Sequence, residues 1–238
     1  MLDPKKTVSE IAREHPTAVA VFERVGIDYC CGGGARLADA CAKAKISLDA
    51  LESAFAEAPR PGDPAVESFP SATALVEHLL ATHHVYTRAA LDRLPLLAAK
   101  VARVHGEHSP ELPEVLRLTS ALADDLLPHM DKEERILFPY IVALEEAAAS
   151  GAPLPFAPFG TVARPIAMMR SEHDDTGNLL RSLREVTKGY ALPEHACNSF
   201  RALYTDLAAL ERDIHLHIHL ENDVLFPMAW RLESSGRD

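Results

Sequence analysis

One pattern occurs twice in this chain and constrains the fold more than any other feature. It reads His-x3-Glu-x4-Phe-Pro, and its two copies run from 129 to 139 and from 217 to 227. A histidine and a glutamate four positions apart lie one turn apart on the same helix face, so both side chains can reach one metal ion. Because both copies also end in Leu-Phe-Pro, the repetition predicts two equivalent helices that carry two equivalent half-sites.

The region around these copies is predicted to be helical. Its hydrophobic pattern predicts four long helices, at 72–104, 111–149, 162–188 and 194–233. Short connections between four helices are typical of an up-down-up-down bundle, so we expect an all-α fold. Four prolines fall inside these helices, where a proline usually kinks or ends a helix: Pro95, Pro128, Pro139 and Pro227.

A small helical domain is expected ahead of the bundle, at residues 1–57. The segment Thr7-Val-Ser-Glu10 is a capping-box pattern that starts a first helix, and further helices are expected at 17–25, 35–44 and 48–57. Residues 58–71 contain four prolines and a glycine, a composition typical of a linker. We therefore predict three parts: 1–57, the linker 58–71, and the bundle 72–238.

Charge and hydropathy exclude several classes of function. The formal net charge of −11 argues against a general binder of nucleic acid or of anionic membranes, because phosphates require lysine and arginine. No apolar stretch approaches the roughly 20 residues of a transmembrane helix. The first residues lack an apolar signal region, which favours a cytoplasmic location.

The apolar stripes of the helices place the repeated pairs in the bundle core. His217 and Glu221 continue the stripe of the fourth helix, whereas His215 and His219 lie beside it and are expected to be ordinary residues. The stripe of the second helix is Val115, Leu118, Leu122, Asp125, His129, Glu133, Ile136 and Tyr140. Carboxylates and imidazoles in a core are costly unless they bind something, and a metal ion supplies that compensation.

The other two long helices are expected to complete the site. His173 lies in the apolar row of the third helix, and the first helix offers His83 and His84, between which its periodicity does not decide. His173 precedes His217 by 44 residues and His84 precedes His129 by 45, as expected for two similar helix pairs. Imidazole and carboxylate ligands together suit iron, manganese or zinc.

Two acidic residues stand next to the expected ligands. Asp125 lies one turn before His129, and Glu172 directly precedes His173. They are candidates for groups that support the ligands or carry protons to the site, and the alternative is that both are ordinary acids of the helix surface.

The small domain contains adjacent cysteines, Cys30 and Cys31, followed by three glycines. Glycine permits close approach of a partner, and a following helix N-terminus favours thiolate, so redox exchange, contact with a metal or cluster, or reaction with nitric oxide are candidate functions. The alternative is a tight turn with two buried, inert thiols. Cys41 and Cys197 are expected to be packed helix residues.

At this point the motifs resemble a known family. The stretches 21–33, 129–139, 172–174 and 217–227 are similar to those of the di-iron repair-of-iron-centres proteins. The resemblance implies a hemerythrin-like four-helix bundle with a non-haem di-iron centre, preceded by a small ScdA-type domain. It also implies a cytoplasmic protein that restores iron-sulfur clusters damaged by nitric oxide or oxidants.

The resemblance further implies particular ligands and partners. It selects His84 over His83, gives Glu133 and Glu221 as bridging carboxylates, and assigns an acidic pair near the centre to Asp125 and Glu172. The implied ligands of the two iron ions are His84, His129, Glu133, His173, His217 and Glu221.

The activity itself stays open at this point. Nitric oxide or oxygen is the expected small ligand, and damaged iron-sulfur proteins are the expected partners. Enzymatic reduction of nitric oxide, donation of iron, and homodimer formation all stay open. The alternative function is oxygen or nitric oxide binding or sensing without turnover.

Overall fold

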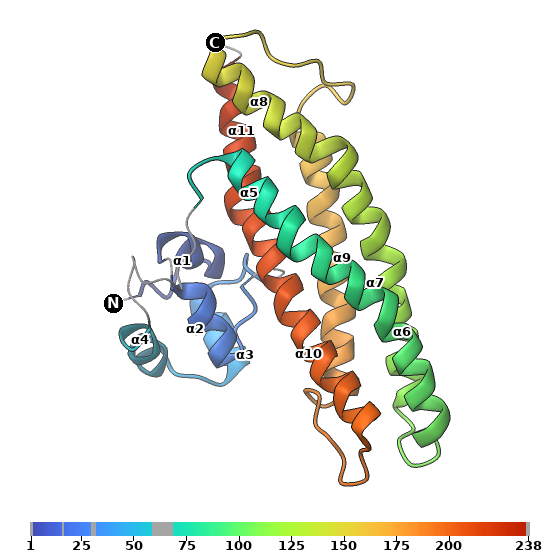
Figure 1. Cartoon of the computed structure of the whole chain (residues 1–238). Coiled ribbons are helices and arrows are strands. Elements are labelled where there is room, and N and C mark those ends of the chain that lie inside the picture. The colour runs from blue at the N-terminus through green and yellow to red at the C-terminus, as the bar shows by residue number, and fades with distance from the viewer. Residues whose placement is uncertain (1, 16, 30–31, 59–68, 237–238) are drawn as a thin grey trace. The chain divides into compact units, whose positions relative to one another are not determined.

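The computed structural model describes residues 2–15, 17–29, 32–58 and 69–236 (Figure 1). Throughout these residues the regular secondary structure is helical, apart from one isolated bridge between Thr7 and Arg36. The predicted all-α class is therefore confirmed. The chain forms two compact units: the first comprises Met1–Ser71 and His215–Met228, and the second comprises Ala72–Ile214 and Ala229–Asp238.

The first unit contains four short helices in its N-terminal part: α1 (Val8–Glu14), α2 (Ala18–Val25), α3 (Leu37–Ala44) and α4 (Leu48–Ala56). The predicted capping box opens α1, because the Thr7 hydroxyl accepts from the Glu10 amide while the Glu10 carboxylate accepts from the Thr7 amide. Gly26 ends α2 with a φ of 75°, a left-handed conformation that glycine adopts without strain. The core side chains of this part include Phe22, Tyr29, Leu37 and Leu51.

The long helices predicted after residue 72 are present, and each of three contains a π-helical segment. The first is α5 (Ala72–His78), η1 (Leu79–His84) and α6 (Val85–His105), and the second is α7 (Leu112–Lys132), η2 (Glu133–Leu137) and α8 (Phe138–Ser150). The third is α9 (Ala163–Val186), and the fourth is α10 (Asn198–His219), η3 (Leu220–Leu225) and α11 (Phe226–Ser235). None of the helices that the structure describes has the length and apolar character needed to cross a membrane.

The helices of the second unit pack along their lengths. The helix α7 packs against both α6 and α9, and α5 packs on α8. Charged pairs join the first part of α10 to its neighbours: Arg93 of α6 binds Asp206 at 2.5 Å, and Arg184 of α9 binds the buried Glu211 at 2.8 Å. The resulting arrangement is the bundle expected from the hydrophobic pattern.

The π segments account for two of the four prolines inside the helices. Pro139 and Pro227 are the second residues of α8 and α11, directly after η2 and η3. A proline offers no amide hydrogen and its ring collides with the carbonyl four residues earlier, so the wider π turn accommodates it without ending the helix. Pro95 and Pro128 lie inside α6 and α7, which continue past them.

The π segments also correct the predicted core stripe of the second long helix. Ile136 was expected in the core, but its side chain is 49% exposed, whereas Leu137 is 1% exposed. A π turn contains an additional residue, so every position after Glu133 is shifted relative to an α-helical period. Asp125 is likewise exposed on α7, and the buried position of that turn belongs to Leu126.

Candidate metal centre

The six residues predicted as ligands are all buried. Glu133 and Glu221 have no exposed surface, and the four histidines are each at most 3% exposed. They come from all four long helical runs, and several lie at π segments: His84 ends η1, Glu133 begins η2 and Glu221 lies in η3. Short π segments inside α-helices occur frequently at functional sites, because the altered register redirects the side chains that follow.

These residues form two groups that share both glutamates. His84 and His217 form one group with Glu133 and Glu221, and His129 and His173 form the other with the same two glutamates. In each group, one ligand atom from every residue lies within 4.8 Å of the others. Such an arrangement can hold two cations, with the carboxylates shared between them.

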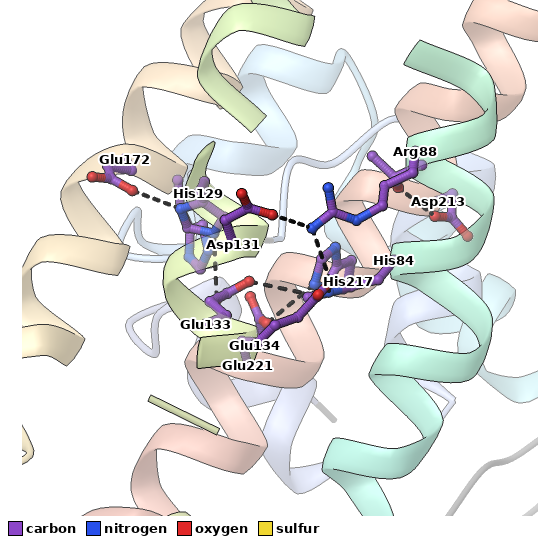
Figure 2. Close-up of polar contacts among 12 residues, drawn as sticks. His84, Arg88, His129, Asp131, Glu133, Glu134, Glu172, Asp213, His217 and Glu221 are labelled. Carbon is purple, nitrogen blue, oxygen red and sulfur yellow. Dashed lines mark hydrogen bonds and ion pairs between the residues drawn. The ribbon is translucent and has the colours of Figure 1, made fainter. Parts of the chain in front are cut away.

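The two oxygens of Glu133 face different histidines (Figure 2). Its Oε2 lies 3.4 Å from Nε2 of His84, and its Oε1 lies 3.3 Å from Nε2 of His129. These histidines belong to different groups, so Glu133 has the orientation required of a bridging carboxylate. The Nε2 atom of His173 also lies beside this group, 3.1 Å from Nε2 of His129. On the remaining side, His217 Nε2 lies 3.1 Å from Glu221 Oε1.

The chemistry of this donor set fits a pair of divalent transition-metal ions. Imidazole nitrogens and carboxylate oxygens together suit iron, manganese and zinc. Two carboxylates without exposed surface carry a large desolvation cost, which bound cations offset.

Two of the histidines also contact a further carboxylate through their Nδ1 atoms. His129 Nδ1 lies 2.7 Å from Glu172 Oε2, and His84 Nδ1 lies 2.8 Å from Glu134 Oε1 (Figure 2). A carboxylate acceptor holds the imidazole proton on Nδ1, which leaves the Nε2 lone pair directed toward the centre. These contacts fix both the tautomer and the orientation of the two rings.

Each of these outer carboxylates is paired with a cationic side chain. Lys132 forms an ion pair with Glu172, and Arg88 binds Glu134 at 3.0 Å and Asp131 at 2.7 Å. Burial raises the pKa of Glu134, but hydrogen bonds from His84 and Arg88 outweigh it and hold the pKa below its usual value. Burial likewise raises the pKa of Glu172, and the bonds from Lys132 and His129 lower it further than burial raises it. Both groups are therefore carboxylates at neutral pH.

The structure separates the predicted acidic residues. Glu172 contacts a candidate ligand directly, whereas Asp125 is exposed on α7 and has no described hydrogen bond to the cluster.

Sequence reasoning missed Glu134, although it stands next to Glu133 just as Glu172 stands next to His173. A carboxylate adjacent to an expected ligand was the signal that could have identified it. Cys30 and Cys31 lie outside the described residues.

The two adjacent histidines of the first long helix have different partners. Both are 2% exposed, but only His84 belongs to the cluster. His83 Nδ1 lies 3.0 Å from Asp213 Oδ1, and Thr87 reaches the other oxygen of Asp213 at 3.5 Å. Of the two histidines between which periodicity did not decide, His84 is therefore the candidate ligand.

Comparisons with known proteins find one family for residues 75–229 and another for residues 4–58. The hemerythrin HHE cation binding domain matches residues 75–229, and ScdA_N, a domain of unknown function, matches residues 4–58. The chain is 36% identical over 224 residues to the iron-sulfur cluster repair protein YtfE of Salmonella typhimurium, a match that covers 93% of this chain and 95% of that protein. It is 37% identical over 226 residues to the protein of the same name from Cronobacter sakazakii, with the same coverage.

Proposed function

This chain belongs to the hemerythrin HHE cation-binding family, and we propose that it repairs iron-sulfur clusters damaged by nitric oxide or oxidants. Support comes from relatives named iron-sulfur cluster repair proteins, which match 93% of the chain, including both the bundle and the small N-terminal domain. The similarity therefore concerns a whole protein of this kind. It is not limited to a shared helical bundle.

The proposed cofactor is a pair of non-haem iron ions. His84 and His217 would hold one ion, His129 and His173 the other, and Glu133 and Glu221 would bridge them. The observation that carries this assignment is the orientation of Glu133, whose two oxygens face histidines of different groups. When bound, iron would supply redox electrons and open coordination positions for nitric oxide or oxygen.

The protein's own residues would prepare the centre for this chemistry. Glu134 and Glu172 orient two imidazoles and keep their protons on the outer nitrogens. The burial of all six ligands keeps bulk water away, which strengthens electrostatic interactions inside the site. Asp125 and Glu172 were both candidates for proton transfer, and the contact of Glu172 with His129 favours Glu172 in that role.

The partners would be damaged iron-sulfur proteins in the cytoplasm, which are the substrates of the proposed repair. The thiols of Cys30 and Cys31 would make contact with such a protein, its cluster or the iron, as adjacent nucleophilic and metal-binding groups can. Both reduction of nitric oxide and donation of iron are compatible with the proposed centre.

The test of this function combines iron content with a repair assay. Glu133→Ala and Glu221→Ala should each lower the iron content well below that of the wild type, because each removes a shared ligand. Both variants should also fail to reactivate a nitric-oxide-damaged [4Fe–4S] hydratase. Asp125→Ala is the matched control, since it removes an exposed carboxylate from the α7 helix that also carries His129. Its iron content should stay at the wild-type level.

Two results would contradict the proposal at different points. Full iron content in both glutamate variants would contradict the bridging assignment. Reversible oxygen binding by the iron-loaded wild type, without nitric oxide consumption or cluster repair, would instead favour a binding or sensing function.

A further inference from the structure

A second buried His–carboxylate pair lies beside the candidate ligands without belonging to them. His219 and Asp223 are 6% and 8% exposed, and His219 Nδ1 lies 2.9 Å from Asp223 Oδ2. They are one helical turn apart, in the same spacing as His217 and Glu221 but two positions later. The sequence had suggested an ordinary role for His219, so its burial needs a reason of its own.

The other oxygen of Asp223 receives contacts from the N-terminal part of the first unit. Ser9 Oγ donates a hydrogen bond to Asp223 Oδ1 at 2.9 Å, and an Arg13 guanidinium nitrogen lies 3.8 Å from the same oxygen. Ser9 and Arg13 both lie on α1, one turn apart. The Asp223 carboxylate therefore joins α1 to the helical segment His215–Met228 within this unit.

The described residues on the two sides of the cysteine pair contact His219 and Ser9. Tyr29, 1% exposed, packs edge-on against His219 with ring centroids 5.5 Å apart. Gly33 accepts a hydrogen bond from the Ser9 amide at 2.9 Å. A Cβ at Gly33 would lie 2.6 Å from Ser9 Oγ and 2.6 Å from the Tyr29 carbonyl oxygen, and because the carbonyl belongs to the backbone, only glycine permits this approach.

We propose that Asp223 is a positioning residue that, with Ser9 and His219, forms a clasp. The clasp holds α1 and the flanks of the Cys30–Cys31 pair on the helical segment that carries the candidate ligands His217 and Glu221. Opening it would release those flanks while leaving the metal ligands in place. The proposal rests on the proposed function only for the purpose of the thiols, because the contacts themselves involve no iron.

The test uses the full-length, iron-loaded protein with Ser9→Ala and Asp223→Ala. Two quantities are measured: amide hydrogen exchange of residues 8–14, and the rate at which iodoacetamide labels Cys30 and Cys31, identified by peptide mass spectrometry. Ser9→Ala should raise both by about tenfold, the factor expected from the loss of one hydrogen bond. Asp223→Ala should raise both by at least as much, because it also removes the contacts with His219 and Arg13. The double variant should behave like Asp223→Ala alone, because Ser9 acts through Asp223. Iron content should stay at the wild-type level in all three.

Two further variants separate the clasp from a general loss of stability. Ser9→Thr keeps the hydroxyl group and should retain wild-type exchange and labelling. Asp206→Ala removes a charged pair with Arg93 from α10, the helix that leads into η3 and Asp223, at a position outside the first unit. It should change neither quantity.

Unchanged exchange and labelling in Ser9→Ala would overturn the clasp. So would faster labelling in Asp223→Ala that appears only together with iron loss, since Asp223 would then be supporting the ligand segment alone. Neither readout requires a damaged cluster. A wild type that fails the repair assay would therefore overturn the proposed function and leave the clasp standing.

Discussion

His83 and His84 are adjacent and equally buried, yet their imidazoles have different surroundings. His84 lies between Glu133 and Glu134, whereas His83 is bound to Asp213. The difference follows from the rotation between consecutive residues around the helical segment η1, which directs one ring into the cluster and the other past it.

This pair provides a matched test of the ligand assignment. His84→Ala should lower the iron content, because it removes one of the four protein donors of its group. His83→Ala should keep the wild-type iron content, although it should cost stability by leaving Asp213 without its imidazole partner. Iron quantification of both purified variants measures the contrast, and equal losses would contradict the assignment.

The two described cysteines differ in burial. Cys41 is buried in α3, as expected, but the expectation of a packed Cys197 was wrong, since that residue is exposed just before α10. Burial raises the pKa of the Cys41 thiol, which disfavours its thiolate. The Cys197 sulfur lies 3.1 Å from His105 Nε2.

We therefore expect selective alkylation of the folded protein. Iodoacetamide at neutral pH should label Cys197 and leave Cys41 unmodified, because the reacting species is an accessible thiolate. In urea both should react at similar rates. Mass spectrometry of the labelled peptides measures this, and early modification of Cys41 in the folded state would contradict its burial.

At the scale of an element, the π segments explain what a periodic pattern could and could not predict. The helices and the His-x3-Glu pairs follow from a 3.6-residue period, although one earlier position of the predicted stripe, Asp125, is exposed. The period then failed at Ile136 because an added residue inside a turn leaves no mark on composition. The contacts of Glu134 and His83 also escaped prediction, because partner choice depends on which neighbouring helix faces them.

The shifted register gives a second matched test. Leu137→Ala should destabilise the protein by about 2–5 kcal/mol, the usual cost of truncating a buried leucine. Ile136→Ala should cost less than about 1 kcal/mol, since surface substitutions have small effects. Urea unfolding of both variants measures the difference. A larger cost at Ile136 would indicate an uninterrupted α-helix in solution.

The start of α1 provides a prediction about helix capping. Thr7→Ala should cost about 1 kcal/mol, the usual loss for removing an N-cap side chain. Thr7→Ser should cost much less, because it keeps the hydroxyl that accepts from the Glu10 amide. Unfolding followed by circular dichroism measures both, and equal costs would mean that the hydroxyl does not cap the helix.

Glu10 gives the same cap a dependence on pH. Its hydrogen bond with the Thr7 backbone amide lowers its pKa below the usual value. A lowered pKa in the folded state means that the contribution is complete above the ordinary glutamate pKa of about 4.3 and is lost as the pH falls through the lowered value. An NMR titration of the Thr7 amide should show this transition below the ordinary range, and a midpoint at the ordinary pKa would contradict the bond.

At the scale of the whole molecule, stability should depend on the metal. The bundle buries Glu133 and Glu221 completely, and bound cations would offset the desolvation cost of their charges. A ligand present at 100 times its dissociation constant stabilises the folded state by about 2.7 kcal/mol. Calorimetry should therefore show a lower melting temperature after chelation. Glu133→Ala should show a smaller change, and an unchanged wild-type melting temperature would contradict the cation site.

The outer pairs of Arg88 and Lys132 also have a consequence for the centre's electric field. Outside the imidazoles, the Glu134 carboxylate is paired with Arg88 and the Glu172 carboxylate with Lys132. In both pairs the opposite charges lie at ion-pair distance, far less than the roughly 8 Å over which physiological salt screens. Although the chain carries a net charge of −11, these two outer carboxylates are each balanced by a neighbouring cation. The chemistry of the metal centre should therefore be nearly insensitive to ionic strength, even at salt concentrations that weaken exposed pairs such as Arg93–Asp206.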